Sequence, residues 1–463
     1  MRVTRARQIA FEVLRRVEEG SYATDLLHAR RRGVKHEDAA LATELTLGVL
    51  RWQRLLDFLL ARHLAKPVAS LDTGVLLALR LGLYQLRFLT RVPARAAVSE
   101  SVELVRHAGK SSAASLVNAV LRRAASATRE SPEELGQRLP PDIPLAERLG
   151  IRYSHPTWMV ERWLSAFGEQ RSVALLEANN RPSRVTCAVA DAACCKQAIS
   201  ALRKSGLGVK PGRLLRSALT VGGGNPAASE AFRRGWISIQ DEASQLIALA
   251  LGVERGQSVL DLCAAPGGKT ALLARAAGPD ALVIAADRHV HRLRAMKEQM
   301  RRVGAAHVGL LALDATGALP FSARFDCILV DAPCSGTGTL SRNPEIRWRL
   351  RPEDFADFHS RQTRLLVGAL ETLAPGGRLV YSTCSLESEE NEQVVEEVVA
   401  NRGDIRRGGD RAALAPHLAE GVRGDDLFDR NGYLRTFPPD HHTDGFFAAI
   451  LAKSPLAGLG GRR

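Results

Sequence analysis

The sequence predicts a multidomain protein with an all-α N-terminal domain, a small α+β module and a C-terminal α/β domain built on a doubly wound, Rossmann-like parallel sheet. Three observations support this fold class. The chain has 463 residues, which is too long for one ordinary hydrophobic core. The first quarter shows only helical periodicity. After residue 250, short apolar runs alternate with amphipathic segments, as strands and helices do in α/β domains.

The all-α domain is expected over residues 1–127. Apolar residues recur there at spacings of three and four, and they predict about five helices. The clearest apolar faces lie in residues 9–17, 41–59, 71–86 and 116–121. A polar, proline-rich stretch then predicts a linker over residues 128–144.

The small α+β module is expected over residues 145–235. The sequence predicts helices near residues 155–167 and 196–206, and strands at 184–190, 218–223 and 236–241. Seven basic residues in this region would extend a basic surface that recognises a polyanion: Arg181, Arg184, Arg203, Lys204, Lys210, Arg213 and Arg216.

The α/β domain is expected over residues 236–455. Five apolar runs predict parallel strands at 258–263, 281–287, 308–314, 325–333 and 378–386, with amphipathic helices between several of them. A last apolar run at 445–454 predicts a terminal antiparallel strand. Residues 403–443 are predicted to form a long loop, and residues 456–463 a flexible tail.

The composition is that of a globular protein, with 45% apolar and 25% charged residues. No stretch is apolar enough for a membrane span, and the first residues lack the apolar core of a signal peptide. We therefore expect a cytoplasmic protein, monomeric and without a membrane partner. Seven cysteines without a CxxC pair, and histidines without ligand spacing, predict reduced thiols and no metal.

The net charge of +14 is unevenly distributed. Residues 1–250 hold 37 Lys and Arg against 23 Asp and Glu, whereas residues 251–463 hold 27 of each. A basic half joined to a neutral half suggests that one part binds a polyanion and the other part acts on it. An Arg-rich solvated surface is the alternative that composition alone leaves open.

The stretch CAAPGGKT, residues 263–270, matches a phosphate-binding P-loop only in part. Gly268, Lys269 and Thr270 fit that motif, but Cys263 stands where the first glycine belongs. A P-loop nucleotidase stays open as an alternative, because the apolar strand that ends at Asp331 also fits a Walker B strand.

Four predicted strands end in an acid: Asp261, Asp287, Asp314 and Asp331. Ligands of doubly wound sheets bind at the carboxyl ends of the strands. Asp287 lies about 20 residues after the glycine turn, where a carboxylate can bond ribose hydroxyls. Acids at strand ends also cap helices, but four in consecutive strands favour a site for a nucleoside-containing cofactor.

Two more strand ends carry cysteine, Cys334 in DAPCSGTGTL and Cys384 in YSTCSL. Each enters a polar turn beside the predicted cofactor cleft, so either thiolate is a candidate nucleophile. A thiolate, an acid and a nucleoside cofactor suit methyl transfer from S-adenosylmethionine to carbon 5 of a pyrimidine. The thiolate would add to carbon 6, while Asp331 would bond ring nitrogen 3. The residues alone do not rank the two cysteines.

The segments QDEASQLIAL, VLDLCAAPGGKT, DAPCSGTGTL, RNPEIRWR, YSTCSLESEENEQVV and DGFFAA together resemble the NOL1/NOP2/Sun family of RNA cytosine carbon-5 methyltransferases. The N-terminal segment ARQIAFEVLRRVEEGSYATDLL resembles the NusB-like RNA-binding domain. The resemblance implies a class I S-adenosylmethionine-dependent methyltransferase that forms 5-methylcytosine in 16S ribosomal RNA. It further implies RNA, and not DNA, as the partner.

The resemblance also implies roles for individual residues. Cys384 would be the nucleophile, and Cys334 would assist product release. Asp331 would lie between the cofactor and the target base, with Asp287 on the ribose and Asp314 near the adenine. The loop around the methionine part of the cofactor would consist of Cys263, Ala264, Ala265, Pro266, Gly267, Gly268 and Lys269. A NusB-like RNA-binding factor with an inactive methyltransferase scaffold is the alternative from another functional class.

Overall fold

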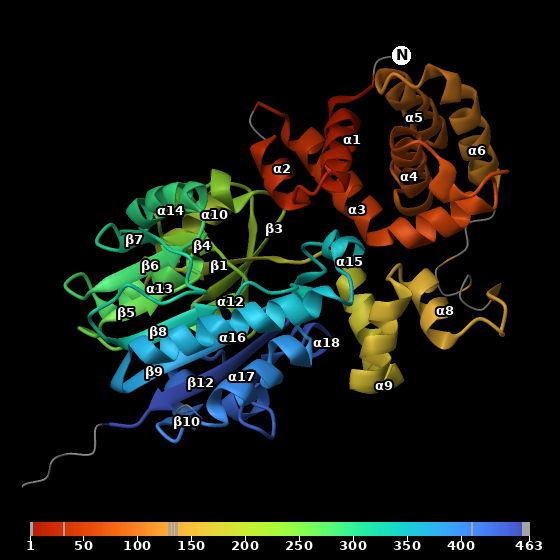
Figure 1. Cartoon of the computed structure of the whole chain (residues 1–463). Helices are drawn as coiled ribbons and strands as arrows, with labels where there is room; N and C mark the ends of the chain where they lie inside the picture. Colours follow the sequence, from red (N-terminus) through yellow and green to blue (C-terminus); the bar gives the residue numbers. More distant parts are fainter. Residues whose placement is uncertain are drawn as a thin grey trace, which may run out of the picture. The chain divides into compact units, whose positions relative to one another are not determined.

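The computed structural model describes residues 3–30, 33–127, 131, 134, 138–408 and 411–455. The chain folds into two compact units (Figure 1). The first unit comprises residues 1–182 and Leu340–Leu350, and the second comprises Ser183–Thr339 and the chain from Arg351 onward. The expected tail at 456–463 lies outside the described residues.

The first unit is helical, as the sequence predicts for residues 1–127, and it also includes helices α8 and α9, which the sequence analysis assigns to the small α+β module. Its α-helices are α1 (Arg5–Glu18), α2 (Ala23–Ala29), α3 (His36–Ala61), α4 (Thr73–Phe88), α5 (Ala94–His107), α6 (Ala114–Ser126), α8 (Leu145–Arg152), α9 (Thr157–Asn180) and α15 (Ile346–Arg349). Leucine, valine and alanine side chains of α1 to α6 pack into one core, because their apolar residues recur on one face of each helix. The seven-residue helix α2 and the eight-residue helix α8 are too short to show the apolar repeat on which the prediction relied.

The second unit contains two sheets. The smaller sheet is antiparallel, with strand order β2-β3-β1-β4. Its strands are β1 (Val185–Val189), β2 (Gly208–Pro211), β3 (Ala218–Gly222) and β4 (Ile237–Ile239), and α10 (Cys195–Lys204) and α11 (Glu230–Arg233) accompany them. The predicted strands at 184–190, 218–223 and 236–241 are confirmed. Strand β2 was not expected, because its residues are mostly exposed and show no apolar alternation.

The larger sheet has the order β10-β12-β9-β8-β5-β6-β7, with β11 paired to β12. Its five parallel strands are β5 (Val259–Asp261), β6 (Val283–Asp287), β7 (Gly309–Ala312), β8 (Phe325–Asp331) and β9 (Leu373–Thr383). Strand β12 (Phe446–Lys453) pairs antiparallel with β9, which confirms the predicted terminal strand.

Helices cover both faces of this sheet (Figure 1). One face packs against α12 (Glu242–Ala250), α13 (Gly268–Ala277) and α14 (Val290–Arg302). The other face packs against α16 (Asp354–Thr372) and α17 (Glu392–Val399). Neighbouring residues of one strand pack on opposite faces of the sheet. Val259 belongs to the core on the side of α12, α13 and α14, and Leu260 to the core on the side of α16 and α17. The doubly wound fold is therefore confirmed.

The prediction of a long loop over residues 403–443 is wrong. This stretch contains β10 (Ile405–Arg407), β11 (Leu434–Thr436), the short helix α18 (Pro438–His441) and two 3₁₀ segments. Both strands have only three residues and form by pairing with β12, so local sequence carries little signal for them.

Candidate active site

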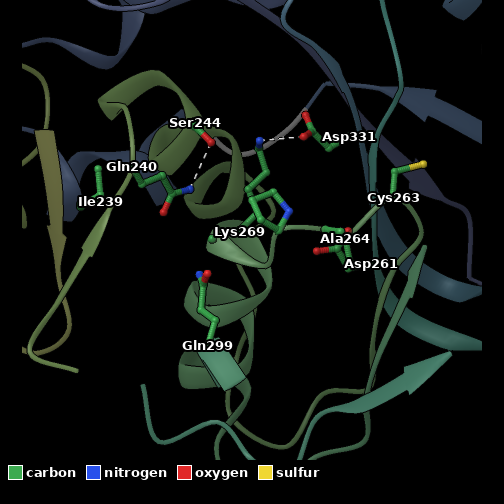
Figure 2. Close-up of a pocket in the computed structure, with 12 residues that line it drawn as sticks. Ile239, Gln240, Ser244, Asp261, Cys263, Ala264, Lys269, Gln299 and Asp331 are labelled. Carbon is green, nitrogen blue, oxygen red and sulfur yellow. Dashed lines mark hydrogen bonds and ion pairs between the residues drawn. The ribbon is translucent and has the colours of Figure 1, made fainter. Parts of the chain in front are cut away.

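A recess lies at the carboxyl ends of β5 and β8, beside the first turn of α13 (Figure 2). The volume of this cavity is about 140 Å³. Residues from the small sheet, the connecting segment and the large sheet line it: Ile239, Gln240, Ser244, Asp261, Cys263, Ala264, Ala265, Pro266, Gly268, Lys269, Gln299 and Asp331. Six of the seven residues predicted to surround the methionine part of the cofactor are therefore together in one recess.

The seventh, Gly267, sets the shape of this loop. It caps the N-terminus of α13 with a φ of 101°, a left-handed conformation that favours glycine. A Cβ atom at this position would lie 2.9 Å from side-chain atoms of Met296 and Met300, so there is also no room for a side chain. The backbone N–H of Ala264 donates to the Ala286 carbonyl at 2.9 Å and fixes the start of the loop on β6.

The acids at the ends of β6 and β7 differ in burial. Asp287 is 5% exposed and accepts hydrogen bonds from the backbone N–H groups of Ala265 and His289, at 3.3 and 2.9 Å. Asp314 lies two residues beyond β7 with about half of its side chain exposed. Hydrogen bonds from Thr316 lower the pKa of Asp314. Asp314 does not line the recess, whereas Asp287 holds the recess loop.

Lys269 and Asp331 form an ion pair inside the recess. Lys269 Nζ lies 2.7 Å from Asp331 Oδ2, and the hydroxyl of Ser382 donates to Asp331 Oδ1 at 2.8 Å. Burial opposes the positive charge, but the Asp331 carboxylate outweighs it and raises the pKa of Lys269. The ammonium is thus directed at Asp331, which does not favour a P-loop in which a lysine contacts phosphates.

Asp261 is the most buried acid that lines the recess. It is 1% exposed, and its Oδ2 accepts from the hydroxyl of Thr270 at 2.7 Å. Its Oδ1 has no hydrogen-bond partner among the described residues. Burial, with a smaller contribution from Asp331, raises the pKa of Asp261 to about 7.

The two candidate cysteines lie side by side. Cys334 Sγ and Cys384 Sγ are 3.3 Å apart, at the ends of the neighbouring strands β8 and β9. Neither lines the recess, although Asp331, three residues before Cys334, does. The hydrogen bond with Cys384 and burial raise the pKa of Cys334 well above its usual value.

Glu390 connects the two cysteine loops and was missed by the sequence analysis. It is fully buried, and its carboxylate accepts hydrogen bonds from the backbone N–H and the hydroxyl of Ser335. The hydroxyl of Ser385 donates to it at 2.5 Å, and Gln362 Nε2 at 3.0 Å. The residues that follow Cys334 and Cys384 therefore share one carboxylate. The only sequence signal was an acidic run directly after the second cysteine motif.

Gln240 and Ser244 were also missed, although they belong to the quoted segment QDEASQLIAL. A glutamine that ends a strand directly before a capping aspartate, Asp241, was the available signal.

Among the described residues, no group of three or more His, Cys, Asp or Glu is arranged to hold a metal ion. No described helix is both long and apolar enough to cross a membrane.

Three family models match the chain in sequence order. The NusB family matches residues 4–126, the ferredoxin-like domain of RsmF/B-like methyltransferases matches 155–227, and 16S rRNA methyltransferase RsmB/F matches 248–452. These matches confirm the predicted order of a NusB-like helical domain, an α+β module and a methyltransferase domain.

Curated relatives extend over the whole chain. A probable ribosomal RNA small subunit methyltransferase B from Bacillus subtilis is 33% identical, covering 98% of this chain and 100% of the relative. A protein of the same name from Synechocystis is 32% identical over 97% of this chain and 99% of the relative.

A solved structure supports the fold of the catalytic part. A methyltransferase homologue from Pyrococcus horikoshii is 29% identical, with a TM-score of 0.55 over 67% of this chain and 99% of that chain. The enzymes of this group use S-adenosylmethionine as the methyl donor. On these similarities, the chain belongs to the RsmB/F family of 16S rRNA methyltransferases.

Proposed function

We propose that the protein methylates carbon 5 of a cytosine in 16S ribosomal RNA, with Cys384 as the nucleophile and Cys334 assisting product release. The observation that carries this proposal is the pair of thiols 3.3 Å apart, at the ends of adjacent strands, with Asp331 three residues before Cys334. A methyltransferase that alkylates a ring nitrogen or a ribose oxygen has no need of two neighbouring thiols.

The residues present fit S-adenosylmethionine. The recess lies at the carboxyl ends of the strands, where ligands of doubly wound sheets bind, and Asp287 offers a buried carboxylate at the end of β6 for ribose hydroxyls. The loop from Cys263 to Lys269 would surround the methionine part, and Asp314 would approach the adenine from the end of β7. When bound, the cofactor supplies a methyl group on a positively charged sulfur.

The chain's own groups would activate the base. The thiolate of Cys384 forms a bond to carbon 6, and the electron pair of the carbon 5–carbon 6 double bond becomes available at carbon 5. Lys269 Nζ lies 2.7 Å from Asp331 Oδ2, and a proton of this pair can be shared with ring nitrogen 3 as negative charge develops there. After carbon 5 carries the methyl group, a base takes the proton from carbon 5, the double bond re-forms, and the Cys384 sulfur leaves carbon 6 with its electron pair.

The hydrogen bond with Cys384 and burial raise the pKa of Cys334 well above its usual value, and this does not favour Cys334 as the nucleophile, because only a thiolate attacks carbon. A thiol 3.3 Å from Cys384 Sγ is placed to stabilise that sulfur when it leaves the base. This supports a role of Cys334 in the last step.

The cysteine variants test the proposal. We expect Cys384→Ala to abolish transfer of a labelled methyl group to 16S ribosomal RNA while cofactor binding persists. We expect Cys334→Ala to accumulate a covalent RNA adduct, seen as a gel shift that resists denaturation. Cys195→Ala, a thiol substitution in the small module, is the control. Full activity of Cys384→Ala would remove this residue from the mechanism, and an absence of both cofactor binding and transfer in the unaltered protein would favour an RNA-binding scaffold.

A further inference from the structure

Gln240 has an unused hydrogen-bond acceptor inside the recess. It follows β4 and precedes α12, and it is 9% exposed. Its Nε2 donates to the hydroxyl of Ser244 at 3.1 Å. Its Oε1 is buried and has no partner anywhere in the described part of the chain. A buried carbonyl oxygen that accepts no hydrogen bond destabilises the protein. A ligand that donates a hydrogen bond to this oxygen removes that cost.

The amide of Gln240 lies against the first turn of α13. A Cβ atom built on Gly268 would be 3.2 to 3.4 Å from the amide atoms of Gln240, so glycine leaves the room that this side chain needs. Figure 2 shows Gln240 and Ser244 on one side of the recess, with Asp261 and Cys263 on the other. Gln240 falls between the residues matched by the ferredoxin-like and methyltransferase family models, 155–227 and 248–452.

The amide oxygen of Gln240 is an acceptor that awaits a donor, whereas the cation of the recess, Lys269, is paired with Asp331. Such a lining favours a ligand group that donates hydrogen bonds and carries a positive charge. Of the donors on S-adenosylmethionine, the α-ammonium belongs to the methionine part, which the loop at the start of α13 would surround.

We propose that Gln240 binds the α-ammonium group of S-adenosylmethionine through Oε1, with Ser244 holding the amide in position. The segment that joins the small sheet to the methyltransferase domain thereby contributes directly to the cofactor site. The inference rests on the proposed placement of the methionine part and is independent of which base accepts the methyl group.

Binding of cofactor analogues without RNA tests this interaction by calorimetry. S-adenosylhomocysteine carries the ammonium and the carboxylate, its decarboxylated analogue carries only the ammonium, and methylthioadenosine carries neither. For Gln240→Ala we expect roughly 10- to 100-fold weaker binding of the first two ligands, the loss typical of a hydrogen bond to a charged group. Methylthioadenosine should bind both proteins within about twofold. An equal loss for methylthioadenosine, or a loss that disappears with the decarboxylated analogue, would overturn the proposal.

Further variants separate this interaction from a general structural effect. Gln240→Glu keeps an acceptor and is expected to restore binding of both ammonium ligands, and a loss as large as that of the alanine variant would contradict the assignment. Ser244→Ala should weaken the same two ligands by a smaller factor. Gln393→Ala, at an exposed glutamine of α17, is the matched control. Because RNA is absent, failure of this test leaves the Cys384 chemistry untouched, and failure of the Cys384 test leaves this one valid.

Discussion

The carboxyl group of Asp261 binds a proton in the folded protein at a pH where the unfolded chain has lost it. Burial at the end of β5 raises its pKa to about 7, against an ordinary value near 4. Between about pH 4 and pH 7 the folded state therefore binds more protons than the unfolded state. Stability contributed by this group falls as the pH rises through that window and stays low above pH 7.

We predict that Asp261→Asn stabilises the protein more at pH 8 than at pH 5. Asparagine keeps an acceptor for the hydroxyl of Thr270 but removes the cost of a buried charge. The gain in free energy of unfolding at pH 8 should be on the order of 2–4 kcal/mol, measured by denaturant unfolding at both pH values. Asp280→Asn, at an exposed acid, is the control. An equal effect of Asp261→Asn at both pH values would show that Asp261 is not the titrating group.

At the scale of secondary-structure elements, Glu390 holds together the turns that follow β8 and β9. Its two oxygens accept from Ser335, Ser385 and Gln362, so one carboxylate sets the positions of the residues next to Cys334 and Cys384. A glutamine in its place would direct an NH₂ group toward one of these donors.

We predict that Glu390→Gln lowers the free energy of unfolding by on the order of 2–4 kcal/mol and slows methyl transfer at least tenfold. The loss should be in the turnover rate and not in the affinity for the cofactor, since Glu390 does not line the recess. Thermal unfolding and single-turnover methyl transfer measure the two effects. Glu396→Gln, on the exposed side of α17, is the control. Unchanged turnover in Glu390→Gln would show that the turns do not need this carboxylate.

Helices and strands could be predicted where apolar residues recur with one clear spacing along the sequence. Helix α13 is one of the amphipathic helices predicted between the strands, and β12 matches the terminal apolar run. Strands β2, β10 and β11 have three or four residues and depend on pairing with distant partners, so their local sequence does not specify them.

The residues of the candidate site could be predicted only where they belong to a recognisable sequence motif. Cys334, Cys384 and Asp331 end long apolar strands, and the sequence alone therefore placed them at one edge of the sheet. Gln240 and Glu390 approach that edge from a connecting segment and from a 3₁₀ turn. Their roles arise from burial and from partners far away in the chain, which no spacing rule describes.

At the scale of the whole molecule, the chain returns once to its first compact unit. Residues Leu340–Leu350 leave the second unit after Thr339 and pack within the first unit. Arg347 is fully buried there and donates to the carbonyl of Ser154 and to Asn180 Oδ1, both at 3.0 Å. The indole N–H of Trp348 donates to the Leu50 carbonyl at 2.6 Å. Burial lowers the pKa of Arg347 well below its usual value, so the hydrogen bonds from its guanidinium offset part of the cost of burying the charge.

We predict that a fragment comprising residues 1–182 is less stable alone than with a peptide of residues 338–352. The peptide fills the space that Leu340–Leu350 occupies in the intact chain, and it binds only the folded fragment. At 100 times its dissociation constant it should add about 2.7 kcal/mol to the free energy of unfolding. Thermal unfolding of the fragment with increasing peptide measures this. A peptide with Arg347→Ala should have little effect, and an equal shift with both peptides would contradict the role of the buried guanidinium.

The uneven charge of the molecule leads to a prediction about RNA binding. The excess of basic residues lies in residues 1–250, and Arg203, Lys204 and Lys210 of the small module are exposed. If they bind phosphates, the triple change Arg203→Gln, Lys204→Gln and Lys210→Gln weakens binding to 16S ribosomal RNA. It should also make the plot of log affinity against log salt less steep, by about 0.7 to 0.9 for each phosphate that is no longer neutralised. Filter binding between 50 and 300 mM salt, roughly the range in which such interactions are screened, measures the slope.

The matched control removes three exposed charges from the neutral half, with Arg294→Gln, Lys297→Gln and Arg430→Gln. Because polyanion binding is assigned to the basic half, the control should leave the slope nearly unchanged, and an equal reduction in both triple variants would show that the charge asymmetry does not define the RNA-binding surface.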